Sequence, residues 1–386
     1  MALSNENAYI KSMKIVAIIL AAGKGTRLKS KLTKPLHNIG GRPMLAWSLD
    51  AAIAANASRT ITVLPPQSEQ IQDWLDGRDF CIQKKPLGTG HAVLSAASQL
   101  ADFDGVALIM FADTPLVTAN TLTRLVSSID TSTSIAVLGF ETSDPHGYGR
   151  LVTDSGGHLM RIVEDKDAND NEKRITLANG GVMAVRCPLL FDLLKRVQPN
   201  SQNGEVYLTD IISTANQNGQ KVTFQLADEA EISGVNDRAD LAHVEAILQQ
   251  RLRYAAMQQG VTLIAPDTVF LSADTILERD VIIEPHVVIG PKTKIGEGSI
   301  IKSFSHVEGA KIGACCVIGP YARVRSGTEA GDGVKIGNFV ETKKSIIGTG
   351  SKANHLTYIG DSVIGTDVNV GAGTITCNYD GFGKFK

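Results

Sequence analysis

Residues 287–296 read VVIGPKTKIG, and the pairing of isoleucine with glycine in this stretch returns along the rest of the chain. Successive pairs are separated by a multiple of six residues or by one residue fewer, and Val307, Val324 and Val370 fill gaps in the series. One aliphatic residue in every six is typical of a solenoid of short parallel strands, in which the aliphatic side chain points into a narrow core and glycine permits a tight corner. We therefore predict such a solenoid from residue 260 onward, and we expect the one-residue deficits to be local slips or protruding loops. The pairs begin at positions 289, 295, 312, 318, 336, 347, 359 and 364.

A different pattern fills the preceding part of the chain. Apolar runs at 15–20, 60–64, 106–111 and 135–140 alternate with stretches of helical pattern such as 44–55 and 90–100. Such alternation predicts a mostly parallel sheet that is covered by helices on both faces. Residues 237–259 contain neither glycine nor proline and carry apolar residues at helical spacing, so we expect one amphipathic helix there. The expected organisation is an α/β domain over residues 1–238, a linker helix over 239–259 and a solenoid domain over 260–386.

The composition excludes several classes of protein. The chain has 386 residues, which is enough for more than one domain with a sizeable core and excludes a disordered or disulfide-stapled miniprotein. Lys and Arg total 38 against 40 Asp and Glu, so no overall positive charge attracts nucleic acid or an anionic membrane. The five cysteines include no Cys-x-x-Cys pair, which argues against a zinc site and a disulfide framework and favours a reducing compartment. Because residues 1–14 are polar and no apolar run is long enough to span a membrane, we expect no signal peptide, no membrane span and a cytoplasmic location.

A turn of small residues follows the first predicted strand. The strand at 15–20 runs directly into Ala21-Ala22-Gly23-Lys24-Gly25-Thr26-Arg27-Leu28, at the edge where open α/β sheets bind nucleotides. The turn is not a P-loop, because a glycine is missing at the required spacing, and it is not a dinucleotide fingerprint, because Leu28 stands at the third glycine. By itself the turn indicates only that its backbone N–H groups could cradle a phosphate.

The form Leu-x-x-Gly-x-Gly-Thr-Arg-Leu, followed by Lys34-Pro35-Leu36, resembles the nucleotidyltransferases that join a nucleoside triphosphate to a sugar 1-phosphate. The resemblance implies that Arg27 and Lys34 are catalytic, because they would neutralise the triphosphate and the charge that develops at the α-phosphorus. It also implies that Gln83 and the turn at 87–92 read the edge of a uracil base, whereas we interpret His91 as a structural cap. The implied nucleotide-binding residues are Leu20, Ala21, Ala22, Gly23, Gly25, Lys34, Gln83, Gly88 and Thr89.

Two residues are candidate ligands for Mg²⁺. Asp113 follows the apolar run at 106–111 and so places a carboxylate at the carboxyl end of a strand. Mg²⁺ needs only one or two protein ligands beside phosphates and waters, and Asn236 matches the second ligand of the family. The alternative for Asn236 is a turn or a cap before the helix expected at 237–259.

Further strings extend the resemblance over almost the whole chain. The strings at 147–150, 179–181 and 204–210, together with Glu164, are similar in order and spacing to the uridylyltransferase half of the bacterial bifunctional enzymes that make UDP-N-acetylglucosamine. In that family Gly149, Glu164 and Asn179 would hydrogen-bond the sugar, and Asn236 completes the nucleotide and sugar site. The implied fold is a Rossmann-like α/β nucleotidyltransferase domain followed by a left-handed parallel β-helix of hexapeptide repeats.

The solenoid carries strings of the acetyltransferase half of the same family, at 323–325, 337–344, 352–358, 369–373 and 378–381. Acetyl transfer to the amine of glucosamine 1-phosphate needs a base, and the resemblance implies that His355 is that base. The implied substrate-binding residues are Arg325 and Lys343 for the phosphate, Tyr358 and Asn369 for the sugar, Asn378 near the acetyl group, and Ala372, Tyr379 and Lys384.

We therefore predict a bifunctional enzyme that acetylates glucosamine 1-phosphate with acetyl-CoA. With UTP and Mg²⁺ it then forms UDP-N-acetylglucosamine and pyrophosphate, for the synthesis of peptidoglycan and lipid A precursors. The implied partners are these small molecules and, through the solenoid, further copies of the chain in a homotrimer, with no nucleic acid and no membrane. Two alternatives stay open: a monofunctional sugar-phosphate nucleotidyltransferase whose solenoid is only a trimerisation scaffold, and a non-enzymatic binding module with the same two-domain plan.

Three features depart from the family pattern. Residues 1–13 form an extension with no evident role. Pro86, Phe111 and Ala112 stand where relatives carry a polar amide, a tyrosine and a glycine near the uracil, so some nucleotide contacts must be supplied differently. The sequence ends at Lys386, where relatives continue for several more coils that help to bind coenzyme A, so we expect a solenoid that is truncated at its carboxyl end.

Overall fold

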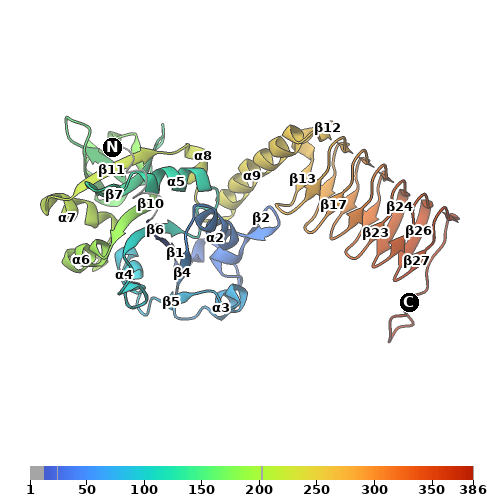
Figure 1. Ribbon diagram of the computed structural model, residues 1–386, viewed down its shortest axis with the longest axis horizontal. Helices are drawn as coiled ribbons and strands as arrows, with labels where there is room; N and C mark the ends of the chain where they lie inside the picture. The colour runs from blue at the N-terminus through green and yellow to red at the C-terminus, as the bar shows by residue number, and fades with distance from the viewer. Residues whose placement is uncertain (1–12, 24, 201–202, 386) are drawn as a thin grey trace. The chain divides into compact units, whose positions relative to one another are not determined.

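The computed structural model describes residues 13–23, 25–200 and 203–385 (Figure 1). The chain divides into two compact units, one of Met1–Asn38 with Pro43–Val244 and one of Ile39–Arg42 with Glu245–Lys386. The extension expected over residues 1–13 lies outside the described residues, except for Met13. Among the residues that the structure describes, no helix is both long enough and apolar enough to cross a bilayer.

The first unit is built on a nine-stranded sheet whose centre is parallel. All six residues of β1 (Ile15–Leu20) are buried, as a central parallel strand requires, and β1 pairs in parallel with β4 and β6. Only β10 runs antiparallel within the main path, while β8 (Arg150–Thr153) and β9 (Leu159–Val163) form an antiparallel pair beside it. The mostly parallel sheet is thereby confirmed. Its order is β11 (Lys221–Leu226), β7 (Thr133–Glu141), β10 (Leu177–Cys187), β6 (Gly105–Phe111), β1, β4 (Arg59–Leu64) and β5 (Phe80–Ile82).

Helices cover both faces of this sheet, because successive side chains of a strand point to opposite sides. Val16 and Ile18 of β1 share a core with α4, α6 and α7, whereas Ile15 and Ala17 share a core with α2 and α5. Both tryptophans, Trp47 on α2 and Trp74 on α3, belong to this unit. The helices are α2 (Met44–Ala54), α3 (Glu69–Leu75), α4 (Thr89–Leu94), α5 (Ala119–Ser127), α6 (Leu189–Arg196), α7 (Ile211–Gln217) and α8 (Glu229–Ile232).

The helix expected at 90–100 is shorter than predicted. The structure ends α4 at Leu94, and a 3-10 turn at Ala97–Leu100 follows. The hydroxyl of Ser95 donates a hydrogen bond to the carbonyl of His91 at 3.0 Å. A serine that bonds back to the preceding turn weakens helix continuation, which explains the break.

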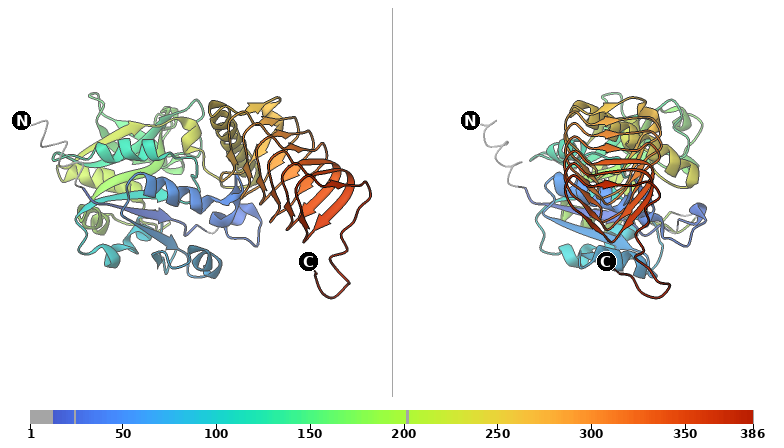
Figure 2. Two further views of the ribbon diagram at one scale, coloured as in Figure 1. Left: turned by 45° about the vertical axis from the view of Figure 1, so that its right-hand side comes forward. Right: turned by 90° about the vertical axis from the view of Figure 1, so that its right-hand side faces the viewer.

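The linker helix α9 (Arg238–Gln258) leads into a three-sided parallel β-helix. Its coils stack on one another, as Figure 2 shows, and the long strand β24 (Lys335–Lys343) turns the corner between two sides by pairing with β21 at one end and with β22 at the other. The first side holds β12 (Thr262–Leu263), β15 (Ile282–Ile283), β18 (Ile300–Ile301), β21 (Val317–Ile318) and β28 (Asn369–Val370), with the first halves of β24 and β26 (Lys352–Gly360). The second side holds β13 (Phe270–Leu271), β16 (Val288–Ile289), β19 (His306–Val307) and β22 (Arg323–Val324). The third holds β14 (Ile276–Leu277), β17 (Lys294–Ile295), β20 (Lys311–Ile312), β23 (Glu329–Ala330), β25 (Ile346–Ile347) and β27 (Val363–Ile364).

The aliphatic residues of the repeat point inward, as the sequence predicts. Ile289, Ile318 and Ile336 belong to one continuous buried core that runs along the solenoid. The one-residue deficits fall at 307–312, 342–347 and 359–364, and each of them lies at the corner between the second and third sides. They shorten a turn there, so the expectation of protruding loops at these positions is wrong.

A column of aromatic rings marks another corner of the solenoid. His286, Phe304, Tyr321 and Phe339 each have a positive φ, between 55° and 62°, at the turn between the first and second sides. Their rings stack from coil to coil with centroids 4.9 to 5.4 Å apart. The stacking offsets part of the cost of holding a non-glycine residue in the left-handed region.

A buried glutamine fastens α9 to the first coils. The side chain of Gln249 is 3% exposed, and its amide both accepts from the Leu271 N–H at 2.9 Å and donates to the Leu271 carbonyl at 2.7 Å. It also donates to Glu245, which accepts from the Gly40 N–H. Gln249 thus takes the place of a neighbouring strand beside β13, and Glu245 extends the bonding to Gly40.

We expect Gln249→Leu to lower the free energy of unfolding of the second unit by about 2–4 kcal/mol, because a buried N–H and a buried carbonyl of Leu271 lose their partner. Chemical denaturation followed by circular dichroism measures this. The matched control is Gln250→Leu, since Gln250 is exposed on the same helix. Equal destabilisation by the two variants would contradict the assigned role of Gln249.

Candidate active sites

A cleft opens at the carboxyl ends of the parallel strands of the first unit, where the sequence predicts the nucleotide site. Its volume is about 600 Å³. Leu20 ends β1, Gln83 follows β5, and Asp113 comes two residues after β6, so the sheet itself gathers these side chains at one edge. The cleft is lined by Leu20, Ala22, Gly23, Gln83, Pro86, Gly88, Thr89, Ala92, Phe111, Asp113, Glu164, Lys166, Glu205 and Tyr207.

The glycine turn positions a lysine beside this cleft. Gly25 has φ +59°, and a Cβ atom at this position would lie 2.6 Å from Cβ of Lys34. Gly25 therefore allows the short 3-10 helix Lys34–Leu36 to approach the turn. A Cβ at Gly23, by contrast, would meet open space, so the backbone there is accessible to a ligand.

Two charged contacts connect the predicted catalytic and metal residues. Nζ of Lys34 lies 2.5 Å from Oδ2 of Asp113, and the Arg27 guanidinium donates to Oδ1 of Asn236 at 2.9 Å. The backbone N–H of Val235 donates to the carbonyl of Asp113 at 2.9 Å, which brings the two pairs together. The structure thus gathers two cations, a carboxylate and an amide at the edge of the glycine turn.

The same group of residues fits Mg²⁺. Among the described residues no cluster of three or more His, Cys, Asp or Glu could enclose a metal, but Mg²⁺ needs only one or two protein oxygens beside phosphates. Asp113 and Asn236 present one oxygen ligand of each kind. Of the two alternatives for Asn236, a turn or a helix cap, the cap is wrong: Oδ1 of Asp237 instead accepts from the N–H groups of Ala239 and Asp240 at the start of α9.

The residues predicted to read the base lie together in the cleft. Gln83 is 5% exposed, and its Nε2 donates to the carbonyl of Gly88 at 3.0 Å. Thr89 accepts from the N–H of Leu208 through its hydroxyl, which fixes the turn before α4. His91 is not the cap that we expected, because its Nδ1 lies 3.2 Å from Nε2 of Gln83 and no side chain caps the start of α4.

The predicted sugar-binding residues form a hydrogen-bonded set. The Thr209 hydroxyl donates to Oε1 of Glu164 at 2.8 Å. The carbonyl of Gly149 accepts from the N–H of Asn179, and Oδ1 of Asn179 accepts from the N–H of Gly181. These bonds leave Nδ2 of Asn179 and the second oxygen of Glu164 without a partner among the described residues, so both can face hydroxyl groups of a ligand.

An ion pair between a buried arginine and a partly exposed aspartate supports this set. The side chain of Arg150, which follows Gly149, is 2% exposed and donates to Oδ1 of Asp165 at 2.8 Å. Burial raises the pKa of the Asp165 carboxyl, but the hydrogen bonds from Arg150 and from the backbone of Gly147, together with the charge of Arg150, hold the pKa below its usual value. Asp165 directly follows Glu164, so the pair connects the two sugar-binding segments.

The second predicted site lies on the solenoid around the exposed His355. Parallel pairing of β24 with β26 sets Asn338 opposite His355, and Nδ1 of His355 lies 3.2 Å from Oδ1 of Asn338. An amide oxygen only accepts, so this contact places the imidazole proton on Nδ1. Nε2 then carries the lone pair that a general base needs.

Cations gather at the other end of β24 and β26, on the second side of the solenoid. Arg325 donates to Glu341 at 2.7 Å, and Glu341 pairs across the sheet with Tyr358. The charges of Lys384 and Arg325 lower the pKa of Lys343 below its usual value. Positive groups that repel one another form a site that a phosphate dianion would stabilise.

The remaining predicted residues of the second site are held by local contacts. Nδ2 of Asn378 donates to Asp361 at 2.6 Å and lies 3.4 Å from the Tyr358 hydroxyl. Tyr379 donates to the carbonyl of Gly381 and pairs with Lys384 through a β-bridge. Asn369 pairs with Lys352 at the far end of β26 from Tyr358, and Ala372 precedes Gly373, which donates to the Leu356 carbonyl. No described contact joins Asn369 or Ala372 to His355.

Sequence reasoning missed several residues of both sites. Asn338 and Glu341 stand in the string at 337–344. Asn338 lies one coil before His355, and this spacing is the signal that could have found it. Lys166, Glu205 and Tyr207 line the nucleotide cleft, and Lys166 lies 4.9 Å from the centroid of the Tyr207 ring.

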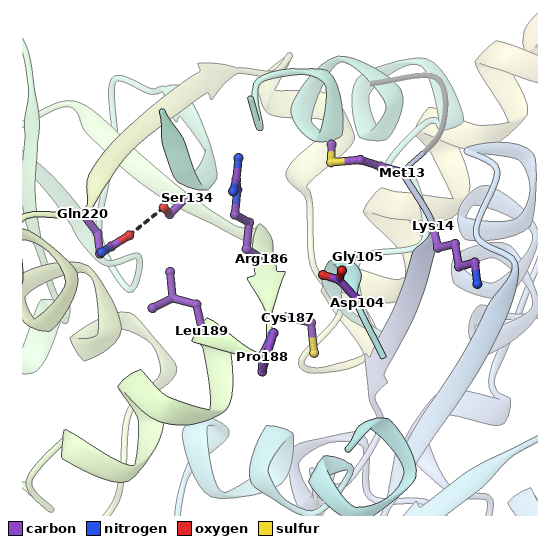
Figure 3. A pocket seen from close by; sticks show the side chains of 10 residues that line it. All are labelled: Met13, Lys14, Asp104, Gly105, Ser134, Arg186, Cys187, Pro188, Leu189 and Gln220. Carbon is purple, nitrogen blue, oxygen red and sulfur yellow. Dashed lines mark hydrogen bonds between the residues drawn. The ribbon is translucent and has the colours of Figure 1, made fainter. Parts of the chain in front are cut away.

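A second cavity of about 620 Å³ lies at the opposite edge of the sheet (Figure 3). It includes Lys14 at the start of β1, Arg186 near the end of β10, and a hydrogen bond between Ser134 and Gln220. None of the predicted site residues lines it, and it lies at the amino ends of the parallel strands, away from the edge where such sheets bind nucleotides.

Comparisons with known proteins agree with the two halves. Residues 17–174 match the family model of the MobA-like NTP transferase domain, and residues 274–309 match that of the bacterial transferase hexapeptide. Curated proteins named Bifunctional protein GlmU are similar over nearly the whole chain. That of Zymomonas mobilis is 47% identical over 96% of this chain and 84% of its own length. Those of Sphingopyxis alaskensis and Maricaulis maris are 48% and 50% identical over 96% of this chain and 83% and 82% of their own lengths.

We expect Asp165→Asn to lower the free energy of unfolding of the first unit by about 2 kcal/mol at pH 7, because the buried Arg150 loses its counter-charge. A carboxyl whose pKa is lower in the folded state adds stability above its unfolded pKa, and this contribution disappears as the pH falls through the folded pKa. The difference in the free energy of unfolding between wild type and variant should therefore become smaller below about pH 4. Urea unfolding at pH 7 and at pH 3.5 measures it.

The matched control is Asp192→Asn, because Asp192 pairs with Lys195 at 3.8 Å on an exposed surface and such a pair contributes little. If Asp165→Asn lowers the free energy of unfolding equally at both pH values, the ion pair is not the cause of the loss.

Proposed function

The chain belongs to the family of bifunctional GlmU proteins, and from this premise we propose which of its residues perform each of the two transfers. One reaction moves an acetyl group from acetyl-CoA to the amine of glucosamine 1-phosphate. The other joins UTP to N-acetylglucosamine 1-phosphate, giving UDP-N-acetylglucosamine and pyrophosphate. The observation that carries the assignment is the contact of Lys34 with Asp113 beside that of Arg27 with Asn236.

In uridylyl transfer an oxygen of the sugar phosphate attacks the α-phosphorus of UTP, and the bond to the β-phosphate oxygen breaks. Arg27 and Lys34 neutralise the negative charge that this displacement concentrates at the phosphates. Asp113 and Asn236 would hold Mg²⁺, which supplies further positive charge to the phosphate oxygens when it is bound. Glu164 and Asn179 orient the sugar, and Arg150 with Asp165 keeps both sugar-binding segments in place.

In acetyl transfer the amine attacks the thioester carbonyl carbon, a C–N bond forms and the C–S bond breaks. Nε2 of His355 accepts the proton of the amine and then gives it to the departing thiolate. Asn338 fixes the imidazole in the tautomer that can do so. Arg325 and Lys343 hold the phosphate of the substrate.

The alternative of a monofunctional nucleotidyltransferase is less well supported. A solenoid that served only as a scaffold would need neither an oriented histidine nor the mutually repelling cations Lys343, Lys384 and Arg325. The exposure of His355 also favours a homotrimer in which a neighbouring solenoid covers the acetyl-transfer site. All five cysteines are free, which favours a cytoplasmic location.

We expect Asp113→Ala to reduce uridylyl transfer by about 10²–10³-fold, because the carboxylate that pairs with Lys34 and would ligate Mg²⁺ is lost. Pyrophosphate release from UTP and N-acetylglucosamine 1-phosphate measures the loss. Acetyl transfer by the same preparation is the control for folding. Undiminished pyrophosphate release would remove Asp113 from the site.

For the solenoid, His355→Ala should reduce the release of free thiol from acetyl-CoA and glucosamine 1-phosphate by about 10²–10⁴-fold, the usual contribution of a general base. Asn338→Leu should reduce it less, since the base remains but loses its orientation. Pyrophosphate release serves as the folding control for both variants. Thiol release at the wild-type rate by His355→Ala would support the monofunctional alternative.

A further inference from the structure

The amide of Gln83 lies in the nucleotide cleft in a fixed orientation. Its side chain is 5% exposed, and its nitrogen, Nε2, lies 3.0 Å from the carbonyl oxygen of Gly88. A carbonyl oxygen can only accept a hydrogen bond, so the amide atom that faces Gly88 must be the NH₂ group. The orientation therefore follows from the chemistry of its partner.

His91 supplies the second acceptor for the same NH₂ group. Its Nδ1 lies 3.2 Å from Nε2 of Gln83. Because that nitrogen can only donate, Nδ1 of His91 must accept, which makes His91 a neutral imidazole with its proton on Nε2. Both N–H bonds of the Gln83 amide are thus directed at fixed acceptors on the turn and on α4.

The frame that holds these two acceptors is rigid. Gly88 has φ +94°, and a Cβ there would lie 2.5 Å from the carbonyl oxygen of Val206. The N–H of Val206 donates to the carbonyl of Leu87, and the N–H of Gly90 donates to the carbonyl of Val206. The turn therefore cannot rotate its carbonyl to suit a reversed amide.

With its nitrogen engaged, Gln83 presents only its oxygen to a ligand. Oε1 has no hydrogen-bond partner among the described residues, and Gln83 lines the cleft. Its neighbours Pro86 and Phe111 carry no side-chain group that can exchange hydrogen bonds with a base. In this part of the cleft Gln83 thus offers the base one acceptor oxygen, beside the hydroxyl of Thr89.

An acceptor oxygen that faces N3 of the base distinguishes the two pyrimidines. Uracil carries a hydrogen on N3 and can donate to it, whereas N3 of cytosine carries a lone pair that an acceptor repels. We propose that His91 is a positioning residue that, together with the Gly88 carbonyl, holds the Gln83 amide with its oxygen toward the base, and that it thereby strengthens the preference for uracil over cytosine. This rests on the proposed uridylyl transfer and goes beyond it by naming a residue that influences which nucleoside triphosphate is used.

Asparagine and leucine at position 91 test the proposal as an isosteric pair. Oδ1 of Asn can occupy the place of Nδ1 and accept from Gln83, whereas Leu offers no acceptor. We expect His91→Asn to keep the ratio of kcat/KM for UTP to that for CTP within about twofold of wild type. His91→Leu should lower this ratio about tenfold, the value of one hydrogen bond to a buried group. The change should appear in KM for the nucleotide, with KM for the sugar phosphate unchanged.

The same substitution in a Gln83→Leu background separates positioning from general disturbance. If His91 acts through Gln83, His91→Leu changes the ratio no further once the amide is gone. His158→Leu controls for loss of a histidine, because His158 is 72% exposed on another loop. Should His91→Leu fail to fold, His91→Phe keeps a ring without an acceptor and takes its place.

An unchanged ratio in His91→Leu, a tenfold loss in His91→Asn, or a full additional effect in the Gln83→Leu background would each overturn the proposal. Absence of pyrophosphate release from UTP by the wild-type protein would instead overturn the proposed function. The two failures are therefore distinguishable in one set of assays.

Discussion

Parallel pairing of strands is the constraint on which both halves of the molecule depend. In the first unit it brings the ends of β1, β5 and β6 to one edge, although Leu20, Gln83 and Asp113 are far apart in the sequence. In the solenoid it sets residues that are one coil apart side by side, such as Asn338 and His355. Parallel pairing thus builds two unrelated sites, one at an edge of the α/β sheet and one on the outer surface of the β-helix.

The two sites share a way of preparing for phosphate. In the first, Lys34 and Arg27 are held by the carboxylate of Asp113 and the amide of Asn236. In the second, Arg325 is held by Glu341 while Lys343 stands among other cations. Positive groups that are already oriented before the ligand binds need little reorganisation when negative charge develops on the ligand.

Sequence reasoning reached the fold because its signals are local. In the solenoid, one aliphatic residue in every six points inward. Apolar runs such as Ile15–Leu20 have the length and composition of buried strands. Sequence reasoning also named Arg27, Lys34 and Asp113, because each of them lies in a short motif or directly after an apolar strand. It could not find the contact of Lys166 with Tyr207 or the role of Arg150, since both depend on how distant loops fold together. The misjudged cap, His91, shows the same limit, because its partner Gln83 lies on another segment.

The distribution of aromatic residues gives each unit its own optical signal. Trp47 and Trp74 both belong to the first unit, so tryptophan emission follows only the unfolding of the α/β sheet and its helices. The stacked rings of Phe304, Tyr321 and Phe339 lie at a solenoid corner, where their order depends on coils remaining aligned. Near-ultraviolet ellipticity sums the contribution of this stack and those of the tryptophans and tyrosines of the first unit, so a change in ellipticity that tryptophan emission does not share comes from the second unit. Melting of the two halves can therefore be followed separately in one intact chain, without any label.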